Sequence, residues 1–83
     1  MTPIWELQLE HGGAGWKGWR ITLVSDVLSA TFSFDERDGI DAPHEAVRKA
    51  LLSEPAQRMA AKGGFEVKVT EIRTVISTEI NPN

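Results

Sequence analysis

The sequence predicts an α+β fold, in which a four-stranded antiparallel sheet in β-β-β-α-β order carries one helical layer on one face. Apolar residues recur at every second position in three early segments and at three- and four-residue spacing in a middle one. The last segment returns to a spacing of two. With 83 residues and no cysteine, the chain has the size of one domain and no disulfide framework, so we treat 1–83 as a single domain.

The three early segments, over 4–10, 19–24 and 28–34, have the alternation of half-buried strands. A polar pair, Ser25-Asp26, suits a turn between the second and the third. We therefore expect a meander of neighbouring strands with one solvated face. The residues expected to face the helical layer are Trp5, Leu7, Trp19, Ile21, Leu23, Phe32 and Phe34.

The middle segment reads as a helix that begins at Asp41-Ala42-Pro43. Asp41 has the residue type of an N-cap, and a proline in the first turn loses no helical hydrogen bond. Ala46, Val47, Ala50 and Leu51 form its apolar stripe. Pro55 ends or kinks this helix, and a second short helix over 56–62 precedes Gly63-Gly64.

In the last segment, from Phe65 to about Ile76, the apolar residues change from one face of the strand to the other. Val67 and Val69 stand at odd positions, and Ile72 stands at an even one. We expect either a β-bulge around Thr70-Glu71 or cover on both faces, by the helix and by a partner chain. The apolar residues left without obvious cover predict a homodimer with this strand at or near the interface. They are Ile72, Ile76 and Ile80.

The stretch HGGAGWKGWR contains the pattern G-x-G-x-x-G at Gly13, Gly15 and Gly18. A dinucleotide loop needs a helix after it, and a P-loop needs Lys and Ser/Thr where Trp19 and Arg20 stand. A kinase glycine loop lies between strands but belongs to a far larger scaffold. We therefore interpret the stretch as the tip of a hairpin and expect no nucleotide cofactor.

Two features of the sequence are candidates for contact with a partner. Trp16 with Lys17 either forms an exposed anchor, as tryptophan often does in binding hot spots, or folds back over the sheet edge. An acidic segment follows the third strand and would steer a basic surface towards the protein. Its carboxylates are Asp35, Glu36, Asp38, Asp41 and Glu45.

Catalytic and metal-binding patterns are weak. His11 and His44 lie far apart and have no cysteine partner, whereas a zinc site needs three or four converging ligands. Counted back from Gly39, the first position of a calcium loop falls on Phe34. Since no nucleophile and base can be paired either, we expect no metal, no cofactor and no enzymatic activity.

The composition also bears on partners and location. A formal net charge of −3 disfavours nucleic acid as a direct ligand, because binding to phosphates draws on Lys and Arg. The beginning of the sequence lacks the basic and apolar regions of a signal peptide, and no apolar run could span a bilayer. We therefore expect a cytoplasmic protein with no membrane contact.

The stretch GWKGWRITL, followed by TFSFDERDGIDAPHEAVRKAL, is similar in layout to the DNA-binding sheets of some plant transcription factors and integrase arm domains. That resemblance implies a solvated face rich in basic and aromatic residues. In this sequence the corresponding face carries one basic residue, Arg20. Its other residues are Glu6, Gln8, Glu10, Thr22, Ser29, Thr31 and Ser33.

In size and acidity the chain resembles inhibitors that phages and mobile elements encode. We therefore expect a non-catalytic module, of the kind of a small phage inhibitor, that binds a basic, nucleic-acid-binding host complex. A DNA-binding sheet-and-helix domain and a small structural subunit remain the alternatives.

Overall fold

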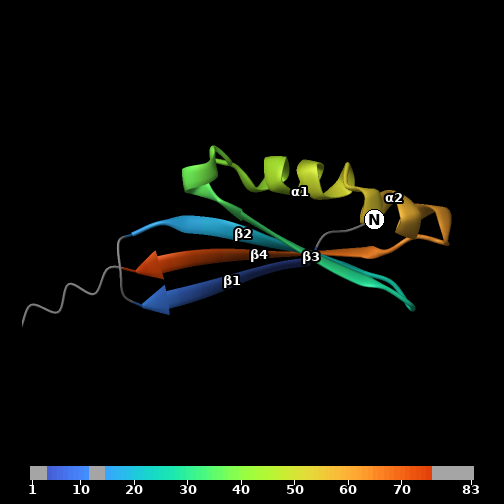
Figure 1. Ribbon diagram of the computed structural model, residues 1–83. Helices are drawn as coiled ribbons and strands as arrows, with labels where there is room; N and C mark the ends of the chain where they lie inside the picture. Colours follow the sequence, from blue (N-terminus) through green and yellow to red (C-terminus); the bar gives the residue numbers. More distant parts are fainter. Residues whose placement is uncertain (1–3, 12–14, 76–83) are drawn as a thin grey trace, which may run out of the picture.

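The computed structural model describes residues 4–11 and 15–75 and shows an α+β fold with one four-stranded sheet (Figure 1). This confirms the predicted class and the order of strands and helices along the chain. The elements are β1 (Ile4–His11), β2 (Lys17–Val24), β3 (Ser29–Asp35), the 3-10 turn η1 (Glu36–Asp38), α1 (Pro43–Leu51), α2 (Glu54–Ala61) and β4 (Glu66–Val75).

The sheet is mixed, so the prediction of a purely antiparallel meander is wrong. Its spatial order is β1-β4-β2-β3, in which β4 lies parallel to β1 and antiparallel to β2. Because β1 and β2 flank β4 and do not pair, the glycine-rich stretch between them is not a hairpin tip. Alternation along a strand specifies the face that each residue occupies, and it contains no information about which strand lies alongside.

The predicted bulge in the last strand is also wrong. The pairing of β4 with β1 and with β2 runs without interruption through Thr70 and Glu71. β4 is an interior strand, in which Val69 is buried on the helix side and Thr70 and Ile72 are buried on the opposite face. The change of parity therefore needs no extra residue. Ile76 and Ile80 lie outside the described residues.

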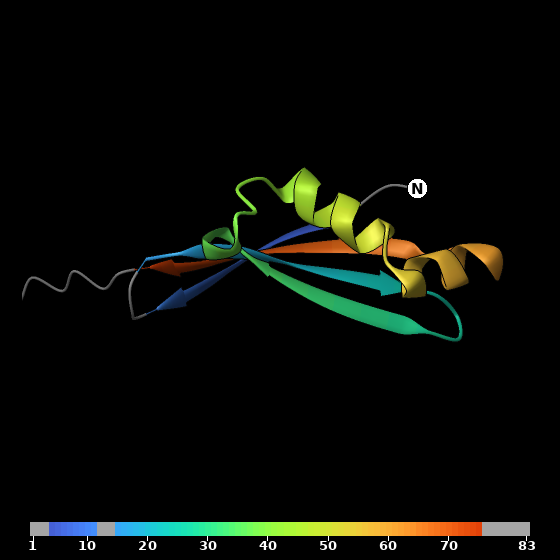
Figure 2. The same ribbon diagram turned by 45° about the horizontal axis from the view of Figure 1, so that its top comes forward.

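The helices lie on one side of the sheet and bury their small and flexible apolar residues against it (Figures 1 and 2). α1 contributes Ala46 and Ala50, and α2 contributes Ala56 and Met59. Alanine lets the helix backbone approach the strands closely, and methionine fills the irregular space that remains. On the sheet side the buried core residues are Trp19, Ile21, Leu23, Val67 and Val69, with Phe32 and Phe34 partly buried against them.

The helix ends differ slightly from those predicted. Ala42, not Asp41, is the N-cap of α1 and forms no side-chain capping hydrogen bond, while Pro43 occupies the first turn as expected. Ser53 caps α2, and its hydroxyl accepts a hydrogen bond from the Ala56 N–H. Pro55 therefore stands in the first turn of a new helix, where it is tolerated, and two glycines with positive φ end that helix.

The first strand departs furthest from the predicted core. Trp5, Leu7 and Leu9 are 54%, 58% and 54% exposed, although they share a face with the core residues of β4 and β2. α1 packs on β2 and β4, while β1 lies beyond β4 at the edge of the sheet. Trp5 and Leu7 were therefore assigned to the correct face, but that face is open at β1.

No helix in the described part of the chain combines the length and the apolar character that crossing a bilayer requires.

Candidate protein-binding site

Trp16 stands immediately before β2, and its carbonyl oxygen accepts a hydrogen bond of 2.9 Å from the Thr74 N–H. Its indole folds back over Gly18, the third glycine of the motif. A Cβ at Gly18 would lie 2.9 Å from Cζ3 of Trp16 and 2.7 Å from the carbonyl oxygen of Phe34. Real Cβ atoms do not approach so closely, so the glycine provides the space in which the indole lies. Of the two alternatives for Trp16, the structure shows the folded-back one.

Arg37 covers Trp16, with its guanidinium carbon 5.2 Å from the centre of the indole ring. The same guanidinium is held by Asp35, since Nη2 donates to Oδ2 at 2.7 Å and Nε donates to both carboxylate oxygens. The backbone N–H of Arg37 also donates to Asp35 Oδ1, at 2.8 Å. A guanidinium held by a bidentate hydrogen-bonded pair can stack on an aromatic ring in one defined orientation.

These hydrogen bonds shift the titration of both partners. The Arg37 side chain, and then its backbone N–H, hold the pKa of Asp35 below its ordinary value. Conversely, the hydrogen bond to Asp35 raises the pKa of Arg37. The pair therefore stays charged over the physiological range.

Trp16 forms a wall of two pockets, which together we call the Trp16 site. One pocket, of about 310 Å³, is lined among others by Glu10, Arg20, Asp35 and Asp38. The other, of about 410 Å³, is lined by Gly15, Trp16, Lys17, Glu36, Arg73 and Thr74. Around the aromatic wall lie both carboxylates, including those of Glu36 and Asp38, and the cations Lys17, Arg20 and Arg73. A side chain with an apolar stem and a cationic head could pack on the indole where the carboxylates face it.

The structure brings together five of the seven residues predicted to contact a partner: Trp16, Lys17, Asp35, Glu36 and Asp38. The other two lie outside both pockets. Asp41 is exposed before α1, and Glu45 is half-buried in its first turn. Lys17 lies over the ring of Trp19, at 5.8 Å from its centre. Within the described residues, no cation lies at ion-pair distance from Glu36 or Asp38.

Sequence reasoning missed Arg37, Gly18, Glu10 and Arg20 as parts of this site. The spacing of Asp35 and Arg37 carried a usable signal, because an Asp side chain often accepts from the N–H two residues on. Glu10 carried none, since its place in the pocket beside Trp16 depends on β4 entering the sheet between β1 and β2. Gly18 was counted with the loop, although it belongs to β2.

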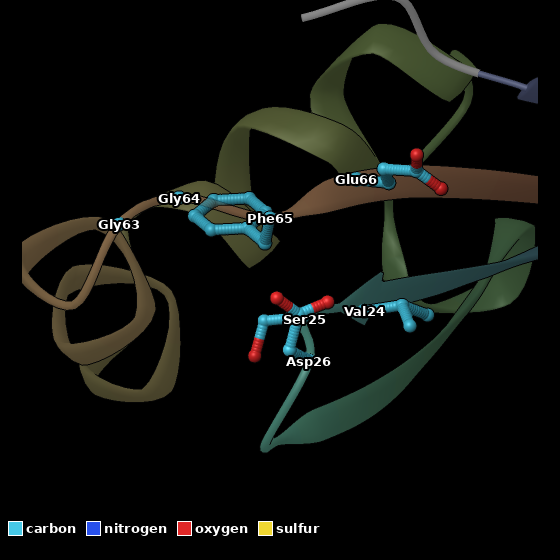
Figure 3. A pocket seen from close by; sticks show the side chains of 7 residues that line it. All are labelled: Val24, Ser25, Asp26, Gly63, Gly64, Phe65 and Glu66. Atoms are coloured by element: carbon cyan, nitrogen blue, oxygen red, sulfur yellow. The ribbon is translucent and has the colours of Figure 1, made fainter.

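A third pocket, of about 420 Å³, lies at the opposite end of β2 (Figure 3). Val24, Ser25 and Asp26 line one side of it, and 63–66 line the other. The Ser25 hydroxyl is occupied by the turn, where it accepts from the Leu28 N–H at 3.1 Å and donates to the Leu28 carbonyl at 3.2 Å. None of the predicted contact residues lies here.

The described residues contain no group of three or more His, Cys, Asp or Glu placed to hold a metal ion. His44 is exposed on α1, and the side chain of His11 lies outside the described residues, as does Gly13. After the glycine motif the chain enters strand β2, so no helix N-terminus follows it. That arrangement differs from the one that dinucleotide and P-loop sites require.

Comparison of the chain with models of protein families, with characterised proteins and with solved structures finds no match. The function is therefore inferred from the geometry of the site.

Proposed function

We propose that the protein is a non-catalytic module that binds the basic surface of another protein, with the Trp16 site as its own contact surface. The observation that carries this proposal is the position of Trp16. Its indole is packed over Gly18 beneath Arg37 and is shared by two pockets that hold the exposed carboxylates of Glu36 and Asp38.

The site matches the chemistry of a Lys or Arg side chain. The alkyl stem of such a residue packs on an aromatic wall, and its cationic head forms charge-assisted hydrogen bonds with carboxylates. Because Arg37 and Gly18 already fix the indole, little side-chain freedom is lost on binding. Tryptophan is also one of the residue types enriched among binding hot spots.

Carboxylates outside the two pockets add to the negative charge that would attract a basic partner. Asp41 and Glu45 follow Glu36 and Asp38 along the chain, and the whole sequence carries a net charge of −3. Such a field raises the rate at which a basic surface arrives, even through groups that never touch it. The partner we propose is a nucleic-acid-binding protein or complex in the cytoplasm. Such a protein carries Lys and Arg for phosphate, and covering that surface would inhibit it.

Direct DNA binding by the sheet is less well supported. The face opposite the helices presents Arg20 and Lys68 among the acidic residues Glu6, Glu10, Asp35 and Glu66. Lys68 is also paired with Glu6, at 3.1 Å. A duplex would therefore meet more negative than positive charge.

The experiment is an NMR titration of the ¹⁵N-labelled protein with a Lys/Arg-rich peptide. We expect the Trp16 indole N–H and the amides of Glu36 and Asp38 to shift. The double variant Glu36→Gln/Asp38→Asn should weaken binding about tenfold, which corresponds to about 1.4 kcal/mol. The matched control is Asp26→Asn/Glu66→Gln, which removes two carboxylates from the pocket at the far end of β2.

Equal weakening by the two double variants would contradict the proposal, because it would show that net charge alone attracts the peptide. Shifts confined to residues away from Trp16 would contradict it as well. A parallel titration with a DNA duplex tests the alternative, since binding there with shifts at Arg20 and Lys68 would support a nucleic-acid function.

A further inference from the structure

β1 presents a surface that the proposed function does not use. It pairs with β4 along one edge only, so its other edge is free within the described sheet. On the helix side of the sheet, Trp5, Leu7 and Leu9 form an apolar row that is more than half exposed. A free strand edge is a template for pairing with another strand, and an apolar row beside it adds contact area.

We propose that a second copy of the chain occupies this edge, with the two β1 strands antiparallel about a two-fold axis at Leu7. The two four-stranded sheets then form one continuous sheet. Leu7 of one copy then lies opposite Leu7 of the other. Trp5 of each copy lies opposite Leu9 of the other copy. The apolar row thus pairs with itself, as a two-fold interface requires.

Charge selects this register from its neighbours. On the other face of β1, centring on Leu7 places Glu6 opposite Gln8 of the second copy. Centring on Glu6 would place two glutamates face to face, and centring on Gln8 would place Glu6 opposite Glu10 twice. Like charges directly opposite destabilise a strand pair. Centres between two residues would set apolar positions against polar ones, because a shift of one residue exchanges the faces.

This inference relocates the self-association predicted from the last strand. β4 is interior to the sheet, and Ile72 is buried, so the described part of β4 offers no edge for pairing. The properties that were expected of β4, namely a free edge and uncovered apolar residues, belong to β1. The dimer does not depend on the proposed function, because the titration tests the Trp16 site and the tests below probe β1.

Cysteine crosslinking tests the register directly, because the chain contains no native cysteine. Opposed residues of an antiparallel pair have Cα atoms about 4.5–5.5 Å apart, within the range that a disulfide spans. We therefore expect Leu7→Cys to give a covalent dimer of twice 9.2 kDa under mild oxidation. Trp5→Cys should not, since its two copies would lie about 13 Å apart along the strands.

Val27→Cys is the control for chance collisions, because Val27 is exposed in the turn between β2 and β3. Crosslinking of Leu7→Cys no faster than Val27→Cys would overturn the proposal. Faster crosslinking of Trp5→Cys than of Leu7→Cys would overturn the register and with it the proposed axis.

A second test leaves the apolar row intact. Gln8→Lys would set a lysine opposite Glu6 at two symmetric places, and Gln8→Glu would set a glutamate there. We expect the dimer dissociation constant to fall about fivefold with lysine and to rise about fivefold with glutamate. Sedimentation equilibrium measures both. A 9.2 kDa species alone for wild type up to millimolar concentration, or equal constants for the two variants, would refute the proposal.

Discussion

Two pentapeptides of this chain, WELQL at 5–9 and WRITL at 19–23, have almost the same pattern and opposite surroundings. Both set a tryptophan and two aliphatic residues on the helix side of the sheet. In WRITL these residues are the centre of the core, and in WELQL more than half of each side chain is exposed. The pattern alone therefore does not decide burial.

The difference follows from the place of each strand in the sheet. β2 lies between β4 and β3, and α1 packs over it. β1 has β4 on one side and a free edge on the other. Local alternation assigns a residue to a face, and the long-range return of β4 and the helices decides whether that face is covered.

The largest contrast is expected between Ile21→Ala and Leu7→Ala. Ile21→Ala should lower the free energy of unfolding by about 2–5 kcal/mol, because it opens a cavity in a fully buried site. Leu7→Ala should change the stability of the monomer by no more than about 0.5 kcal/mol. Urea denaturation at a concentration where any dimer has dissociated measures both. Equal losses would show that β1 is covered within the monomer.

A smaller difference in stability is expected between substitutions at the residues that precede the two tryptophans. These residues are Ile4, before Trp5, and Gly18, before Trp19. Replacing glycine by alanine often stabilises a strand by limiting the unfolded chain. Here the added Cβ would meet the Phe34 carbonyl at 2.7 Å, so we expect Gly18→Ala to cost about 1–3 kcal/mol.

The same variant should move the indole N–H resonance of Trp16, which lies against Gly18. Ile4→Ala serves as the comparison, because Ile4 is half exposed. A Gly18→Ala protein as stable as wild type, with Trp16 unmoved, would contradict the close packing described for this end of β2.

The smallest effect concerns Asp35, beside the WRITL strand. Hydrogen bonds from Arg37 hold the pKa of Asp35 below its ordinary value of 3.8. A carboxyl whose pKa is lower in the folded state stabilises that state above its unfolded pKa and loses this effect as pH falls through the folded pKa. Arg37→Ala should therefore raise the pKa of Asp35 towards 3.8, as measured by NMR of the carboxyl carbon.

Arg58→Ala is the control, since it breaks a similar exposed pair with Glu54 on α2. An Asp35 pKa that is the same in wild type and in Arg37→Ala would show that the pair does not form in solution.

Much of the fold follows from local signals. Alternation located all four strands, and the three- and four-residue spacing located α1. Pro55 and Gly63-Gly64 bracketed α2 because their backbone limits are intrinsic to the residues. Pairing could not be predicted in the same way, because the parallel contact of β1 with β4 joins residues that are 64 positions apart, as in Ile4 with Lys68.

The candidate site shows the same division. Trp16, Asp35, Glu36 and Asp38 were identified from residue type and local charge, and η1 brings the last three near Trp16 through a short turn. Glu10 and Arg73 reach the site through the pairing of β4. The sequence does not indicate that pairing, so their approach could not be anticipated.

Amide hydrogen exchange as a function of protein concentration tests most directly whether β1 is open in the monomer and paired in a dimer. In the dilute protein we predict slow exchange throughout β2 and fast exchange at alternate residues of β1, whose N–H groups point to the free edge. In the concentrated protein those β1 amides should become protected, with β2 unchanged. Rapid exchange at the same β1 amides at every concentration, or exchange in β2 as fast as in β1, would contradict this account.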